Sequence, residues 1–263
     1  MKQHNDDRLH PESTDFCMLD YDCAYLPGRK TRMYYRYIRE AEPEFVTAVI
    51  RRGWRRFGNY FFHPICQGCD ACKSLRIDVE AFRPTRSQKK AIKRNRETRI
   101  LVQPPSLTPG HIELYNRYHA WKAEKDGWRH RDISEREYYE NFVEGAHEFG
   151  YEILYIRDNR LVGVDLIDVV EDGISAIYFY HDPNYARLSL GTYSLLYQIS
   201  LARQLGKRWI YLGYWVDGCQ AFAYKTKFQP EELLDGFPGV EEEPEWKPFA
   251  KAELSNGELG MAN

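Results

Sequence analysis

The chain has 263 residues, of which 43% are hydrophobic and 15% aromatic, and its formal net charge is -2. That length allows one large domain or two modest ones, and that apolar content excludes a chain that is disordered throughout. No apolar run approaches the roughly 18 residues that a membrane-spanning helix needs, and the polar first residues lack the apolar core of a signal peptide. We therefore expect a cytoplasmic protein with no membrane partner, whose six cysteines are reduced.

The near-zero net charge hides an uneven distribution. Residues 28–103 contain 19 Lys and Arg against 7 Asp and Glu, whereas residues 231–263 contain 2 against 9. A basic first half indicates a polyanionic partner, with a merely solvated surface as the alternative. The acidic last segment also carries several Pro and Gly residues, which predicts a loose tail over residues 231–263.

Turn residues and apolar spacing divide the chain before the cysteines into a leader and three short elements. Residues 1–15 are expected to form a flexible leader, and Pro27 with Gly28 marks a turn. The predicted elements are a strand over 34–38, a helix over 44–53 and a strand over 59–63.

Residues 63–99 combine a cluster of thiols with a basic segment. Cys66, Cys69 and Cys72 lie within seven positions, and a strand is predicted after them over 75–79. From residue 87 onward, basic residues recur every three or four positions, which predicts a helix with a basic face. We expect a small domain over residues 16–103 that is braced by its cysteines and presents charge to a nucleic acid.

Pro and Gly residues over 104–110 mark the predicted boundary of a second domain, residues 104–230. Two helices, over 111–124 and 134–142, are expected to open it. The later elements are strands over 152–157 and 160–170 joined at Asp158-Asn159, a strand over 173–180, a helix over 190–205, a strand over 209–214 and a short helix over 221–225. The predicted fold class is therefore α+β.

This order of three strands, a helix, a strand and a helix resembles the acyltransferase fold of the GNAT class. The resemblance implies two parallel strands that splay apart, beside a helix whose first N–H groups are free to stabilise an oxyanion. Enzymes of that class that use acetyl-CoA usually carry a glycine-rich loop there, whereas Ser189-Leu190-Gly191-Thr192 offers a single glycine. Coenzyme A is therefore not the expected donor, and Gly191 alone is better explained by close helix packing.

Several longer motifs resemble the bacterial aminoacyl-tRNA–protein transferases, relatives of eukaryotic arginyltransferase that act in the N-end rule pathway. They occur in family order over about residues 23–228. The motifs are CAYLPGR at 23–29, GWRRFG at 53–58, PICQGCDAC at 64–72, SQKK at 87–90, KRN at 93–95, SLGT at 189–192, YLGYWV at 211–216 and AYKTKF at 223–228.

The resemblance implies an N-terminal cysteine-containing basic domain followed by a GNAT-like transferase domain. The implied reaction moves an amino acid from its tRNA to the α-amine of a protein that begins with Asp or Glu, and so marks that protein for degradation. The short bacterial layout favours leucine as the donor amino acid. An arginyltransferase acting on the same acceptors and a non-catalytic RNA-binding module are the alternatives.

This reaction asks for no cofactor and no dedicated nucleophile. The tRNA ester is already activated, and an α-amine with a pKa of about 7.7–8.0 is partly neutral at pH 7. The enzyme has to hold amine and ester together, stabilise the oxyanion and accept a proton. We expect the backbone near Ser189 and Gly191 to stabilise the oxyanion and Tyr214 and Lys225 to line the site. Asp217 is a candidate proton acceptor, although an Asp-Gly turn explains it equally well.

The acidic side chain of the acceptor requires a cation, preferably with a planar fork of donors. Arg55, Arg56 and Arg76 are the candidates, with tRNA phosphate contact or plain surface as alternatives. Four further cations are assigned to tRNA phosphates, a contact that weakens with salt. They are Lys89, Lys90, Lys93 and Arg94.

Cys23, Cys66, Cys69 and Cys72 together would make a four-thiolate set suited to zinc or an iron–sulfur cluster. Eukaryotic relatives carry Cys-X-X-Cys at the first of these positions, whereas the residue three after Cys23 is Leu26 here. Metal binding and buried reduced thiols both stay open on this spacing.

Overall fold

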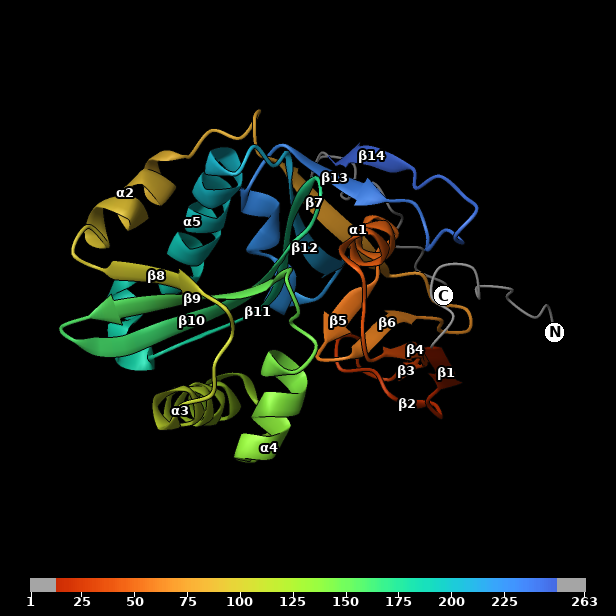
Figure 1. Ribbon diagram of the computed structural model, residues 1–263, viewed down its shortest axis with the longest axis horizontal. Coiled ribbons are helices and arrows are strands. Elements are labelled where there is room, and N and C mark those ends of the chain that lie inside the picture. The colour runs from red at the N-terminus through yellow and green to blue at the C-terminus, as the bar shows by residue number, and fades with distance from the viewer. Residues whose placement is uncertain (1–12, 250–263) are drawn as a thin grey trace, which may run out of the picture.

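Most of the chain folds around one eight-stranded sheet in the computed structural model, which describes residues 13–249 (Figure 1). The strand order is β14-β13-β7-β12-β11-β10-β9-β8. The strands are β7 (Cys72–Asp78), β8 (Arg99–Gln103), β9 (Gly150–Arg157), β10 (Arg160–Val169), β11 (Gly173–His181), β12 (Trp209–Val216), β13 (Glu231–Leu234) and β14 (Trp246–Phe249). Neighbouring strands are antiparallel except for β11 and β12, which are parallel. This mixed sheet confirms the predicted α+β class.

The hairpin and the helix predicted in the second half are present. Asp158 and Asn159 connect β9 to β10 with φ angles of 51° and 58°. These are the left-handed angles that a tight two-residue hairpin needs, and Asp and Asn adopt them more readily than most residues. The predicted helix over 190–205 is α5 (Leu190–Gln204), which follows a 3-10 segment, η2 (Pro183–Leu188).

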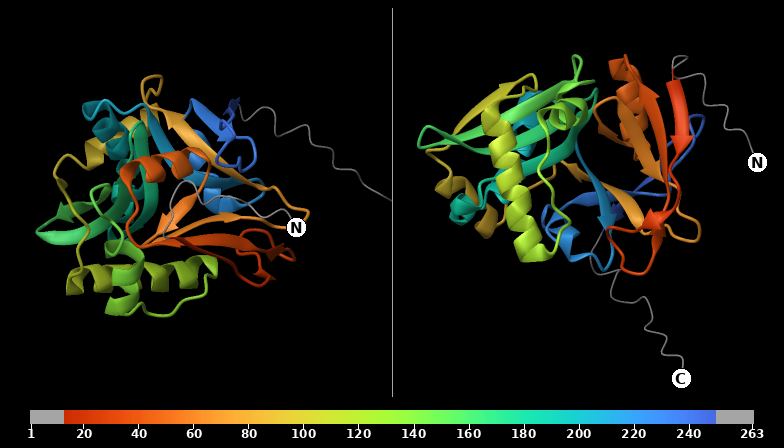
Figure 2. Two further views of the ribbon diagram at one scale, coloured as in Figure 1. Left: turned by 45° about the vertical axis from the view of Figure 1, so that its right-hand side comes forward. Right: turned by 90° about the horizontal axis from the view of Figure 1, so that it is seen from below.

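Helices cover both faces of the large sheet. On one face, α2 (Arg86–Arg94) packs against α5, and α5 packs against β11 and β12. On the other face, α3 (Pro109–Asp126) lies across β10 and β11, with α4 (Glu135–Tyr138) beside it (Figure 1 and Figure 2). The predicted helix over 134–142 is divided, because a π-helical turn, η1 (Tyr139–Val143), follows α4. None of the helices within residues 13–249 is both long enough and apolar enough to cross a lipid bilayer.

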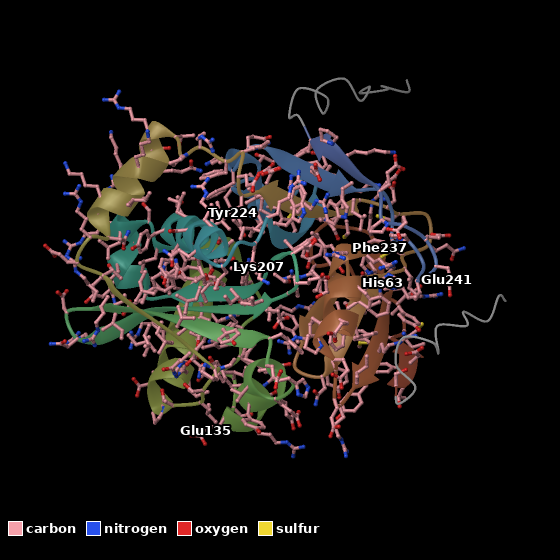
Figure 3. All side chains as sticks on the ribbon, turned by 45° about the horizontal axis from the view of Figure 1, so that its top comes forward. His63, Glu135, Lys207, Tyr224, Phe237 and Glu241 are labelled. Atoms are coloured by element: carbon pink, nitrogen blue, oxygen red, sulfur yellow. The ribbon has the colours of Figure 1, made fainter. Side chains whose placement is uncertain are left out.

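A second, four-stranded sheet with the order β1-β4-β6-β5 lies beside the first. Its strands are β1 (Ser13–Cys17), β4 (Met33–Ile38), β5 (Arg55–Phe57) and β6 (Tyr60–Pro64), and a small hairpin joins β2 (Tyr21–Asp22) to β3 (Lys30–Thr31). The apolar side of α1 (Pro43–Arg51) packs in one core with Trp209 and Tyr211 of β12. His63 of β6 also stacks on Phe237 with 5.1 Å between ring centroids (Figure 3). The two sheets therefore share a core.

The large sheet does not divide at the predicted domain boundary after residue 103. β7 and β8 precede that boundary, yet they lie in the same sheet as β9 to β12. The basic helix α2 likewise packs on α5 rather than on the cysteine segment. The reason is burial: Leu75 and Ile77 of β7 and the adjacent Val79 share one face of that strand and are fully buried in the core that α5 and β12 help to form. Periodicity identifies such a strand without indicating which sheet it joins.

Both predicted loose ends contain ordered strands. β1 begins at Ser13, within the predicted leader, while residues 1–12 lie outside the described part of the chain. At the other end, Glu231–Leu234 and Trp246–Phe249 form the strands β13 and β14 of the large sheet. Leu234 and Phe249 are buried, so two short apolar anchors hold a segment whose average composition is acidic. Residues 250–263 of the predicted tail lie outside the described residues.

We expect a chain that ends after Pro230 to be destabilised by several kcal/mol, because it loses both strands and each buried Leu or Phe contributes about 2–5 kcal/mol. Thermal unfolding followed by circular dichroism measures the effect. A chain that ends after Phe249 keeps every described strand and is the control. Equal unfolding midpoints for the two truncations would contradict a structural role for β13 and β14.

Candidate active site between two splayed strands

The parallel strands β11 and β12 separate soon after they start. Their ladder pairs only Gly173–Ser175 with Trp209–Tyr211. β11 then continues to His181 and β12 to Val216 without further pairing between them. Carbonyl groups on both strands are therefore left without strand partners, as the GNAT resemblance implies. We call this region the β11–β12 splay.

Arg55 of β5 reaches the β11 side of the splay. Its Nη2 donates hydrogen bonds to the carbonyl oxygens of Ala176, at 2.6 Å, and Ile177, at 3.0 Å. On the other side it lies against Gly213 of β12, where a Cβ atom would meet the Arg55 Cζ at 2.6 Å. Gly213 also has a φ of 67°, so both the contact and the backbone require glycine there.

Arg55 has no acidic partner among the described residues, and its Nε and Nη1 groups make no hydrogen bond to them. Burial lowers the pKa of its guanidinium, and the hydroxyls of Tyr214 and Tyr25 oppose that effect. An arginine stays charged even so. Asp168, the acidic side chain that acts on Arg55 electrostatically, is already paired with Arg56. The splay thus contains a cation without an ion pair among the described residues, and a buried charge of this kind favours an anionic ligand.

Lys225 holds the β12 side of the splay. Its Nζ donates to the carbonyl oxygens of Leu212, at 2.7 Å, and Tyr214, at 2.5 Å. The side chain is 5% exposed, and burial, followed by the charge of Arg55, places the pKa of its amine well below the ordinary value. The lysine predicted to line the site therefore acts on the backbone of β12, and it does so from the face opposite to β5.

The tyrosine predicted to line the site contributes in two ways. The backbone carbonyl of Tyr214 accepts from Lys225, while its hydroxyl donates to the carbonyl of Phe62 at 3.4 Å. Burial raises the pKa of that hydroxyl far above its usual value, and the nearby charge of Arg55 opposes the rise. Tyr214 is consequently a neutral neighbour of Arg55.

Two further tyrosines surround Arg55, and sequence reasoning assigned neither of them to the site. Both Tyr25 and Tyr224 interact electrostatically with the guanidinium, and the Tyr25 ring packs edge-on against Phe222 at 5.0 Å. Burial raises the pKa of Tyr224 to about 12 although 48% of the residue is exposed, so its hydroxyl end is the buried part. The available signal was their place in the motifs CAYLPGR and AYKTKF, which the structure brings together.

The predicted oxyanion donors lie at the start of α5, where β11 leads into the helix. Ser189 adopts a left-handed conformation with φ 55°, and no described group accepts a hydrogen bond from the backbone N–H of Leu190 or Gly191. Such free N–H groups are suited to stabilising negative charge. The hydroxyl of Ser189 accepts from Arg94 of α2 at 3.3 Å. Among the described residues, no hydrogen bond links this turn to Arg55 or Lys225.

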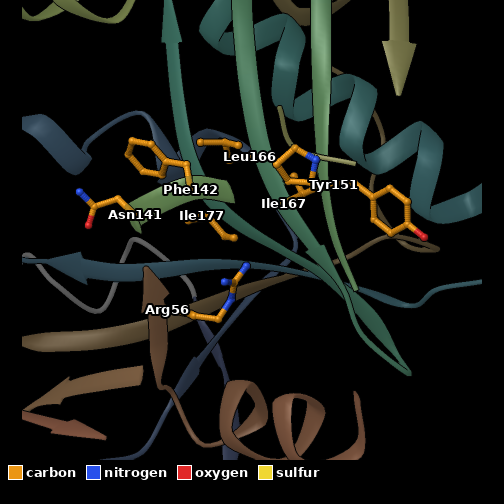
Figure 4. A pocket seen from close by; sticks show the side chains of 8 residues that line it. Arg56, Asn141, Phe142, Tyr151, Leu166, Ile167 and Ile177 are labelled. Carbon is orange, nitrogen blue, oxygen red and sulfur yellow. The ribbon is translucent and has the colours of Figure 1, made fainter. Parts of the chain in front are cut away.

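Arg56 lies away from the splay and has a complete set of partners. It forms a buried ion pair with Asp168, at 2.5 Å and 2.9 Å, and donates to the carbonyls of Gly58 and Gly145. Figure 4 shows Arg56 beside a crevice lined by Phe142 and other apolar residues, which leaves no room even for a water molecule. Arg56 is thus a structural residue in this arrangement.

The contacts of Arg76 and Asp217 also give both residues structural roles outside the splay. Arg76 pairs with Glu232 and stacks between Trp209 and Trp246, at 3.6 Å and 4.3 Å from their ring centroids. The carboxylate of Asp217 is exposed and accepts from the backbone N–H of Gly218 at 2.9 Å, as expected for an Asp-Gly turn. The structure brings neither residue into the splay.

Asp165 is a buried carboxyl that sequence reasoning missed. It accepts hydrogen bonds from Ser194, at 2.9 Å, and Gln198, at 2.7 Å, both on α5. Burial raises its pKa to about 7, so it titrates near neutral pH. It is also an electrostatic neighbour of Tyr224. An Asp within the apolar run 160–170 was the signal for a buried acid.

The four predicted cysteines gather without converging on one point. The pKa of Cys72 is raised to about 12, mainly by burial and then by the thiols of Cys66, Cys23 and Cys69. The sulfur of Cys23 accepts from two backbone N–H groups at 3.4 Å. Residues 13–249 contain no group of three or more His, Cys, Asp or Glu side chains placed to hold a metal ion. Metal binding at these cysteines stays a prediction.

Comparison with known families decides the identity. Residues 21–90 match the N-terminal family of arginine-tRNA-protein transferases, and residues 110–235 match the C-terminal family. An aspartate/glutamate leucyltransferase of Campylobacter jejuni is 43% identical over 84% of this chain and 92% of its own length. The aspartate/glutamate leucyltransferase of Helicobacter hepaticus is 41% identical over 86% of this chain and 94% of its own length. This chain belongs to the aspartate/glutamate leucyltransferases of the arginine-tRNA-protein transferase family.

Membership in this family of aminoacyltransferases sets aside the RNA-binding module and the acetyl-CoA enzyme. Among solved structures, FemX superposes with a TM-score of 0.50 and 7% sequence identity, over 89% of each chain. At that identity the likeness concerns the fold alone, and it agrees with the GNAT-like architecture of this leucyltransferase family member.

We expect Arg56→Met to cost about 3–5 kcal/mol of stability, because it leaves Asp168 buried without its partner. Urea unfolding measures the loss. The double variant Arg56→Met, Asp168→Leu removes both charges and should recover much of the stability that the single variant loses. An Arg56→Met protein of unchanged stability that had lost its preference for acidic acceptors would instead restore Arg56 as the acceptor-binding cation.

Proposed function

We propose that the protein transfers leucine from leucyl-tRNA to the α-amine of proteins that begin with Asp or Glu, which marks them for degradation in the N-end rule pathway. The observation that carries this proposal is the identity of 41–43% with leucyltransferases over more than nine-tenths of their length. A cytoplasmic localisation, where charged tRNA is made, is part of the proposal.

The chemistry is aminolysis of an ester. The nitrogen of the neutral α-amine attacks the leucyl carbonyl carbon, and the resulting oxyanion collapses with cleavage of the bond to the tRNA ribose oxygen. One amine proton ends on that oxygen, so a new amide and a free tRNA 3′ end are formed. The free N–H groups of Leu190 and Gly191 are the proposed oxyanion donors. The ester is already activated, and we propose that the reaction needs no cofactor.

We propose Arg55 as the residue that recognises the acidic side chain of the acceptor. Of the three candidate arginines, Arg56 and Arg76 are neutralised by Asp168 and Glu232, whereas Arg55 binds only carbonyl oxygens. Its Nε and Nη1 donors are available for a carboxylate. The space beside it is small, about 10 Å³, which holds about one water molecule. One carboxylate oxygen fits that space and supplies a negative charge to Arg55.

We propose Lys225 as a positioning residue that fixes the backbone of β12 at the splay. Its two hydrogen bonds satisfy the carbonyls of Leu212 and Tyr214, which a neighbouring strand would otherwise satisfy. Tyr214 orders the same segment through its hydroxyl. Burying a lysine without hydrogen-bond partners is costly, so these two hydrogen bonds fix the AYKTKF segment beside β12.

The basic face of α2 is proposed to bind tRNA phosphates. Thr85 and Gln88 form a capping box at its start, and the buried Ala91 and Asn95 attach it to the body of the protein. The outward residues are all exposed: Lys89, Lys90, Lys93 and Arg94. Arg94 contacts Ser189, so phosphates held on α2 lie next to the proposed oxyanion donors. Binding through such contacts weakens as salt rises.

A zinc ion or an iron–sulfur cluster at the cysteines is also proposed, outside the reaction itself. Cys23, Cys66, Cys69 and Cys72 would hold it through their sulfurs and would join the loop before β3 to the start of β7. Elemental analysis of the purified protein tests this part.

We expect labelled leucine to pass from leucyl-tRNA to a peptide that begins with Asp, and labelled arginine from arginyl-tRNA to be transferred much less. Scintillation counting of the purified peptide measures both. An acetylated peptide is the control, because it has no free amine. Transfer from arginyl-tRNA alone would overturn the proposed donor, and no transfer from either would overturn the proposed function.

We expect Arg55→Met to remove the preference for an acidic acceptor, lowering kcat/KM for an Asp peptide about 10- to 100-fold, the usual effect of a charged hydrogen bond. Steady-state kinetics with matched Asp and Asn peptides measure the preference. Arg51→Met, which alters a half-exposed arginine paired with Asp172, is the control and should keep it. An Arg55→Met enzyme that still prefers Asp over Asn would contradict the assignment. A loss of kcat on both peptides is expected instead for Lys225→Met.

A further inference from the structure

A group of aromatic residues at the C-terminal end of α3 has no part in the site described so far. Tyr118 and Trp121 lie on the last turns of α3, and Trp128 follows its Gly127 cap. The ring of His181, the last residue of β11, lies 5.3 Å from Tyr118 and 6.0 Å from Trp121. Trp128 is 38% exposed, and its ring centroid lies 6.0 Å from that of His119 in an edge-on arrangement. We call Tyr118, Trp121, Trp128 and His181 the α3 platform.

The α3 platform adjoins the splay. His181 ends the strand whose carbonyls bind Arg55, and Tyr118 is an electrostatic neighbour of Tyr224. Tyr224 is in turn a neighbour of Arg55 and directly precedes Lys225. A ligand that lies on the platform can therefore extend into the splay.

Positive charge accompanies these rings. The ammonium groups of Lys122 and Lys125 lie 4.5 Å from the ring centroids of Trp128 and Trp121. Lys122 also pairs with Asp126, whereas Lys125 and Arg129 are exposed. Trp128 is the exposed ring, while Tyr118, Trp121 and His181 are partly buried. Aromatic rings interleaved with cations bind single-stranded nucleic acid, since bases stack on the rings and phosphates meet the cations. The Asp or Glu side chain of the acceptor has no aromatic face to stack on these rings.

We propose that the α3 platform binds the unpaired 3′ end of the donor tRNA, with Trp128 as a base-stacking residue and Lys125 as a phosphate contact. This inference rests on the proposed function for the identity of the RNA and adds a second RNA contact to that of α2. The two surfaces have different tasks. α2 holds phosphates of the body of the tRNA, and the platform directs the terminal nucleotides, and so the ester, into the splay.

Binding of uncharged tRNA tests this without relying on catalysis. Fluorescence anisotropy compares full-length leucine tRNA with the same tRNA lacking its three 3′-terminal nucleotides. The wild type should bind the full-length form more tightly. Trp128→Ala should weaken full-length binding about 5- to 100-fold, the usual effect of losing one stacked base, and should abolish the difference between the two RNAs. Trp128→Phe keeps an aromatic face and should retain most of the affinity for full-length tRNA.

Tyr139→Ala is the matched control, because Tyr139 is 47% exposed and lies outside the platform. If Trp128→Ala does not fold, Lys125→Glu replaces it, and it should also weaken full-length binding selectively. Equal weakening of both RNAs, or no weakening, would overturn the proposal. So would a rise in KM for the acceptor peptide instead of leucyl-tRNA. A wild type that distinguishes the two RNAs but transfers no leucine would refute the proposed function and leave the platform assignment standing.

Discussion

Two buried basic side chains, Arg55 and Lys225, hold the splay between β11 and β12, and the site depends on them. Parallel strands that separate leave carbonyl groups without partners, which is costly away from water. Arg55 satisfies two of these carbonyls on β11, and Lys225 satisfies two on β12. Each cation comes from a different part of the chain and approaches from a different face of the sheet. The splay is therefore built by side chains from outside the two strands.

The same constraint explains why the small sheet cannot be separated from the large one. Arg55 and Arg56 are adjacent in β5, so their side chains point to opposite faces of that strand. Arg56 is fixed by Asp168 of β10, which places β5 against the large sheet and carries Arg55 to β11. The bulge and the glycine at position 213 then make room for the guanidinium on the β12 side. One arginine attaches the strand, and the other reaches the site.

The sequence predicted local elements far better than their partners. The Asp158-Asn159 hairpin, α5 and the basic helix follow from turn chemistry and periodicity, which act within a few residues. The sheet that β7 joins, the anchoring of β14 and the carboxylates that neutralise Arg56 and Arg76 are long-range pairings, and one sequence does not contain them. For the same reason three equivalent arginines could be proposed and only the fold distinguished them. Tyr25 and Tyr224 were missed because their motifs are distant in sequence and adjacent in space.

The two cations of the splay also repel one another, and this bears on acceptor choice. The charge of Arg55 is the second cause, after burial, of the depressed pKa of Lys225. A carboxylate bound to Arg55 cancels that repulsion, whereas an amide side chain of the same shape does not. An acidic acceptor thus favours the protonated form of Lys225, which has three N–H donors and uses two of them on β12. On the proposed function, acceptor charge is therefore recognised through its effect on the site as well as through direct hydrogen bonds.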